Sequence, residues 1–118
     1  MRRKSDVLME EALKDLEVGC YNKAVSAAYF SVRAAVEHLL PGLRTSKDDK
    51  IANALKRVLR RELGDEGAEE ARGKFLALFE ARKVADHRPK SMEEEEARFY
   101  VSLAVDLRKM ILKLTSRP

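Results

Sequence analysis

Residues 22–40, NKAVSAAYFSVRAAVEHLL, carry two nonpolar faces at helical spacing, one of large and one of small side chains. A helix with a single apolar stripe covers a core from one side, whereas two such faces need neighbours on both sides. We therefore expect a central helix in a bundle. The large face holds Val25, Tyr29, Val32, Val36 and Leu39, and the small face holds Ala24, Ala27, Ala28, Ser31 and Ala35.

Apolar periodicity predicts further helices on either side of this segment, separated by turn residues. One helix is expected over about residues 6–17, with Ser5 as its cap. Another should begin at a capping box at 46–49 and end at Leu63, and the next should cover 66–86. The last should begin after a second capping pattern at 91–94. Gly19 and Gly64 would make turns, and Pro89 would end the fourth helix close to His87. Short connections make successive helices antiparallel. The prediction is an all-α, up-and-down antiparallel bundle of four to five helices.

The length of 118 residues suits one domain, which we place over residues 1–118. Charged residues make up 37% and apolar residues 45% of the chain, with only three prolines and five glycines. This composition favours helices and argues against a β architecture.

Cys20 is the single cysteine, so no internal disulfide and no cysteine zinc site is expected, and we expect its side chain to be buried. The consecutive acids Glu93 to Glu96 would point around a helix rather than converge on a metal ion, and they suit a helix N-terminus. We expect no metal and no cofactor. No leader and no apolar run of membrane-spanning length is seen, which predicts a cytoplasmic protein with no membrane partner.

Arg82 is the most unusual residue, because it shares a helical stripe with the apolar Phe75, Leu78 and Phe79. In one interpretation its aliphatic stem packs and its guanidinium reaches water or an internal carboxylate. The other interpretation is functional, because the net charge of +4 is compatible with a polyanionic ligand.

The functional interpretation pairs Arg82 with His87 at the expected helix end. Residues five apart on a helix point about 140° away from each other, so His87 must leave the helix for both side chains to meet one phosphodiester. Histidine exchanges protons near neutral pH, and arginine stabilises a pentavalent phosphorane. Both roles suit metal-independent RNA cleavage by the substrate's own 2′-hydroxyl.

One chain has only one suitable histidine, and a twofold dimer would supply the second. Lys83, Arg88 and Lys90 are candidates for binding flanking phosphates. Asp86 is a further candidate at the substrate site, where it would orient the imidazole.

The chain resembles the HEPN domain family, named for nucleotide-binding proteins of higher eukaryotes and prokaryotes. The resemblance covers nearly the whole chain and lies in GCYNKAV at 19–25, AAY at 27–29, TSK at 45–47 and RKVADH at 82–87. The last segment matches the family's Arg-x4-6-His motif with four intervening residues. Two positions depart from active relatives: Lys83 replaces a frequent small polar residue, and Pro89 replaces a tyrosine that is modified in some toxins.

This resemblance implies a homodimer with the motif near its interface and, for many members, endoribonuclease activity as the toxin of a toxin-antitoxin pair. It also implies a small nucleotidyltransferase as antitoxin partner. The alternative is a non-catalytic module that binds RNA or a nucleotide, or that supports the nucleotidyltransferase, and a purely structural dimer is a third interpretation. The enzyme requires Arg82 and His87 to converge in an open basic cleft. The structural interpretation predicts Arg82 in a buried ion pair and His87 turned away.

Overall fold

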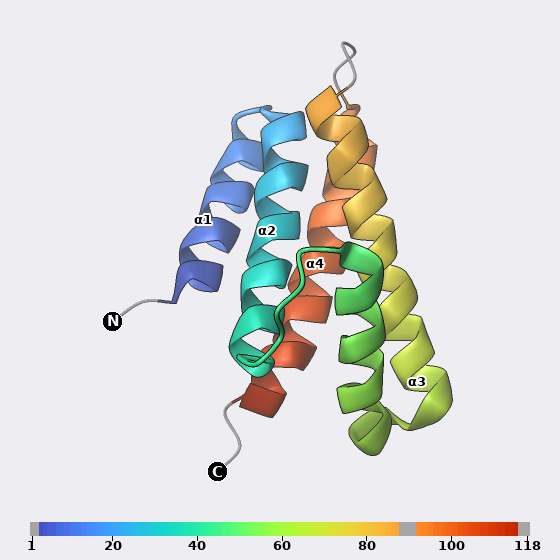
Figure 1. The fold of residues 1–118 in the computed structure, drawn as a ribbon. Helices are drawn as coiled ribbons and strands as arrows, with labels where there is room; N and C mark the ends of the chain where they lie inside the picture. The colour runs from blue at the N-terminus through green and yellow to red at the C-terminus, as the bar shows by residue number, and fades with distance from the viewer. Residues whose placement is uncertain (1–2, 88–91, 116–118) are drawn as a thin grey trace.

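The described residues, 3–87 and 92–115, form four helices and no strand in the computed structural model. The helices are α1 (Lys4–Glu17), α2 (Tyr21–Leu39), α3 (Asp48–His87) and α4 (Glu94–Thr115). They run up and down alongside one another (Figure 1). The prediction of an all-helical bundle is therefore confirmed.

Helix α2 lies at the centre of the bundle and contacts each of the other three helices (Figure 1). Ser31 of its small face bonds to Ser5 of α1, and Tyr29 of its large face packs against Phe75 of α3. The predicted two-sided packing is confirmed. Its buried residues are Ala24, Val25, Ala28, Tyr29, Ser31, Val32, Ala35 and Val36.

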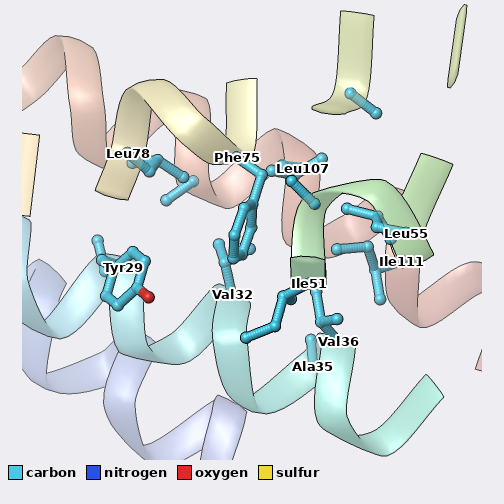
Figure 2. Packing of buried hydrophobic residues seen from close by; sticks show 14 of the residues in the cluster. Tyr29, Val32, Ala35, Val36, Ile51, Leu55, Phe75, Leu78, Leu107 and Ile111 are labelled. Atoms are coloured by element: carbon cyan, nitrogen blue, oxygen red, sulfur yellow. The ribbon is translucent and has the colours of Figure 1, made fainter. Parts of the chain in front are cut away.

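Most of the hydrophobic core lies between α2, α3 and α4 (Figure 2), and Met9 and Ala12 of α1 also belong to it. The rings of Tyr29 and Phe75 lie 6.0 Å apart, between centroids, and join α2 to α3. Leu107 and Ile111 close the core from α4 and are fully buried. A smaller cluster at the end of α3 joins Val25 of α2 to residues of α3 and α4; its other buried members are Ala81, Ala85, Met92 and Ala97.

Helix α3 bends sharply at Gly64, where φ is 75° and ψ is 175° (Figure 1). These dihedrals are accessible almost only to glycine. We call residues 48–63 the first arm and residues 65–87 the second arm; they correspond to the two helices expected on either side of a Gly64 turn. Gly67 also suits this bend, because a Cβ there would lie 2.8 Å from that of Leu63.

Polar side chains join the two arms on their exposed side. Lys56 Nζ lies 2.6 Å from Glu69 Oε2, and Arg72 Nε donates a hydrogen bond of 2.7 Å to Asn53 Oδ1. The pKa of Glu69 is lowered, first by its hydrogen bond with Lys56 and further by Arg72. The arms are therefore paired along their length as well as joined at Gly64.

Helix α1 begins differently from its capping prediction. Ser5 lies inside the first turn of α1, where it is buried and donates to the Ser31 carbonyl at 2.8 Å instead of capping the helix. Helix α3 begins at Asp48, whose carboxylate accepts a hydrogen bond from the Tyr29 hydroxyl. At α1 the contact with α2 therefore uses the side chain that the local pattern assigned to a cap, whereas α3 begins inside the predicted 46–49 segment. Ser91 lies outside the described residues.

Helix α1 is fixed to the bundle by a group of hydrogen bonds that we call the Ser5–Arg108 network. Ser31 Oγ donates to the Ser5 carbonyl at 2.6 Å, and Arg108 Nε donates to Ser5 Oγ at 2.7 Å. Arg108 also forms an ion pair with Asp6. The network joins α1, α2 and α4 at one place.

Different helix ends lie at the two ends of the bundle. In Figure 1, α1 begins and α4 ends toward the lower part of the view, whereas α3 ends and α4 begins at the top. The bundle measures 39 Å along its longest axis. In the described part of the chain, no helix combines the length and apolar character needed to cross a membrane.

Candidate functional site

The last turns of α3 carry four of the predicted site residues: Arg82, Lys83, Asp86 and His87. Ala81 and Ala85 alternate with them and are buried in the smaller apolar cluster. This packing holds the end of α3 against α2 and leaves the charged side chains at the edge of the cluster.

Arg82 lies on the half-buried face, as its stripe predicted. Its Nε is 2.9 Å from Asp86 Oδ2, and its guanidinium carbon lies 5.0 Å from the centre of the Phe30 ring and 5.7 Å from that of Tyr29. The side chains of Arg82 and Asp86 are 28% and 29% exposed. The ion pair lacks the alignment of a hydrogen bond, so the buried Nε has no hydrogen-bond partner among the described residues.

Lys83 extends along another face of the helix. Its Nζ lies 5.0 Å from the centre of the Phe79 ring and 3.7 Å from Glu80 Oε1. In this conformation the ammonium contacts its own helix rather than the Arg82 face.

His87 is exposed and is the last residue of α3. Because the helix continues through this residue, its side chain points about 140° away from that of Arg82. The structure of one chain brings Arg82 and Asp86 together and does not bring His87 to them. Arg88 and Lys90 lie outside the described residues.

Asn22, in the first turn of α2, was not predicted as a site residue. Its Nδ2 donates to the Ala85 carbonyl at 2.7 Å, and its Oδ1 accepts a hydrogen bond from the Met92 backbone N–H at 2.7 Å. We call this pair of bonds the Asn22 clamp. A signal was available in the sequence, because an asparagine early in a helix often bonds to backbone groups.

A groove of about 500 Å³ runs beside Asp86, between α1, α2 and α3. Three of its lining residues are acidic, namely Glu11, Asp15 and Asp86, and Lys23 is the basic one. Within one chain this groove is therefore not the basic cleft that the ribonuclease interpretation requires.

Tyr29 does not offer its ring to a ligand, since it is fully buried. Burial and then its hydrogen bond to Asp48 raise the pKa of the Tyr29 hydroxyl, which keeps it protonated as a donor to that carboxylate. Arg33 Nη1 also donates to this hydroxyl at 3.4 Å. Tyr29 thus joins α2 to the start of α3.

Cys20 is exposed, so the expectation that its side chain is buried was wrong. It lies just before α2, directly after the turn at Gly19. Among the residues described, no group of His, Cys, Asp and Glu side chains is arranged to hold a metal ion.

No family model, curated protein or solved structure matches the chain.

Proposed function

We propose that the protein is a metal-independent endoribonuclease of the HEPN type that acts in the cytoplasm as a homodimer. The observation that carries this proposal is the position of Arg82 and His87 on the final turns of α3, with His87 exposed at the very end of the helix. Within one chain the two side chains point apart, so the proposed site needs a second chain.

A twofold dimer that pairs the ends of α3 supplies the missing groups. An isologous interface presents the same patch from both chains, so two Arg82 and two His87 side chains lie near one axis. One histidine then acts as base and the other as acid.

The proposed reaction proceeds by internal transfer of the phosphodiester. One His87 accepts the proton of the 2′-hydroxyl as its oxygen attacks phosphorus, and the other His87 donates a proton to the leaving 5′-oxygen. The products are a 2′,3′-cyclic phosphate and a 5′-hydroxyl. The Arg82 guanidinium stabilises the charge on the phosphorane.

Arg82 must leave Asp86 to reach that phosphate. A partly exposed ion pair is worth only about 0–1 kcal/mol, so exchange of the carboxylate for a phosphate has a small cost. The unsatisfied Nε of Arg82 would gain a hydrogen-bond acceptor in the exchange.

A second candidate is a non-catalytic module that binds RNA or a nucleotide, or that partners a nucleotidyltransferase antitoxin. The Arg82–Asp86 ion pair supports a non-catalytic role, since it engages the arginine within its own chain. In this case the end of α3 is a docking surface rather than a catalytic centre.

Cleavage of a labelled RNA in excess EDTA separates the candidates. The variants are His87→Ala and Arg82→Ala, with His38→Ala as the matched control because His38 is the other histidine and is exposed at the end of α2. Circular dichroism checks that each variant folds. We expect wild type and His38→Ala to leave a cyclic phosphate, and the other two variants to lose roughly 100-fold or more in rate.

Light scattering provides the second measurement, with an expected mass of twice the 13.4 kDa of one chain. A monomer, or cleavage that survives His87→Ala, would contradict the dimeric ribonuclease. RNA binding without cleavage by the folded wild type would favour the non-catalytic module.

A further inference from the structure

The Asn22 clamp joins three parts of the chain that meet beside the proposed site. Its two hydrogen bonds connect α2 with residues 63 and 70 positions further along the sequence. We infer that Asn22 is a positioning residue that fixes the last turn of α3, and with it His87. The catalytic consequence rests on the proposed function, whereas the fixing of the helix end does not.

The clamp requires an amide, because one side chain must donate and accept at the same time. Ala85 is among the last four residues of α3, whose carbonyls have no partner within the helix. The Met92 N–H precedes α4 and likewise has no helical acceptor. Both bonds are partly buried, so losing either would leave a poorly hydrated polar group.

The position of Ala85 explains how the clamp acts on His87. Helix ends fray, and the final turn is normally the least protected part of a helix. The Ala85 side chain is buried against α2 and its carbonyl is held by Asn22, so the backbone is fixed on two sides only two residues before His87. The exposed imidazole of His87 therefore extends from a backbone whose position is fixed.

Three variants separate the parts of the clamp. Asn22→Ala removes both bonds. Asn22→Asp keeps an acceptor for Met92 but replaces the donor to the Ala85 carbonyl with a carboxylate oxygen. Asn53→Ala is the matched control, because Asn53 is the other asparagine and bonds to Arg72 between the two arms.

Nuclear magnetic resonance tests the clamp without reference to activity. In Asn22→Ala we expect exchange of the Met92 amide to accelerate roughly tenfold or more, and the imidazole signals of His87 to shift while those of His38 stay in place. Asn22→Asp should leave Met92 protected and still shift His87, which keeps the test decisive if Asn22→Ala does not fold. Asn53→Ala should change neither residue.

RNA cleavage tests the catalytic consequence. We expect Asn22→Asp to lower kcat about tenfold with little change in KM, since a displaced acid or base slows the chemical step more than binding. Unchanged His87 signals in both Asn22 variants, or equal shifts at His38, would overturn the inference. If the wild type does not cleave RNA, the ribonuclease fails, and the Met92 and His87 signals still decide whether the clamp exists.

Discussion

At the residue scale, Arg82 combines contacts of two kinds: an ion pair with the Asp86 carboxylate and cation–π contacts with the rings of Phe30 and Tyr29. Its half-burial was predictable, because it follows from spacing along one helix. The contact with Asp86 was predictable in the same way, because Asp86 lies four residues further along the helix. The contacts with the two aromatic rings were not predictable, because the rings lie on α2 and their distance from Arg82 depends on how α2 and α3 align.

Replacing Arg82 separates the packing of its stem from the effect of its charge. We expect Arg82→Ala to lower the free energy of unfolding by about 1–2 kcal/mol, because stem packing and the cation–π contacts are both lost. Arg82→Met keeps an unbranched apolar stem and should lose roughly half as much. Urea denaturation measures the difference. Equal losses in the two variants would show that the stem contributes nothing.

At the scale of the element, α3 shows what local patterns predict well and where they fail. The Gly64 bend was predictable, because turn residues interrupt two apolar periodic segments. The start of α1 was not, since Ser5 bonds to α2 instead of capping its helix. A capping residue has more than one partner available, and its choice depends on neighbours that are distant in sequence.

Replacement by alanine should change the stability of the protein in opposite directions at two glycines of α3. Gly64→Ala should destabilise by about 1–3 kcal/mol through backbone strain, although its Cβ would meet no atom within 4 Å. Gly73→Ala should stabilise by about 0.5–1 kcal/mol, because this exposed helical position also has open space for a Cβ. Thermal unfolding compares them. A stabilising Gly64→Ala would mean that the bend does not have a positive φ.

At the scale of the whole molecule, the Ser5–Arg108 network fixes α1 both to α2, the next helix in the sequence, and to α4, the last one. Arg108 and Ser5 are separated by 103 positions, and no spacing rule relates them. The central place of α2 was nevertheless predictable from its two nonpolar faces. The sequence therefore indicates which helix is surrounded, whereas the particular polar pairs between helices depend on the assembled bundle. For the same reason, Arg82 and His87 could be proposed from a motif. The place of Asn22 early in a helix indicated a bond to the backbone, but not that its partners are Ala85 and Met92.

Arg108 should be the surface arginine to which stability is most sensitive. Its side chain is 16% exposed, so we expect Arg108→Ala to lower the free energy of unfolding by about 2–3 kcal/mol by leaving partly buried polar groups unpaired. Arg98→Ala is the control, because Arg98 is 57% exposed in its pair with Glu94 and should matter little. Urea denaturation, with hydrogen exchange of α1 amides, measures both. Similar losses in the two variants would contradict the network's role in holding α1.

The start of α1 and the end of α4 lie opposite the end of α3, which has a practical consequence for experiments. Helix α1 begins and α4 ends toward one end of the bundle, and α3 ends at the other (Figure 1). A tether attached at the start of α1 or at the end of α4 would therefore hold the molecule on a support with the His87 end facing away. Immobilised protein could thus meet long RNA, or a second chain, without obstruction from the surface.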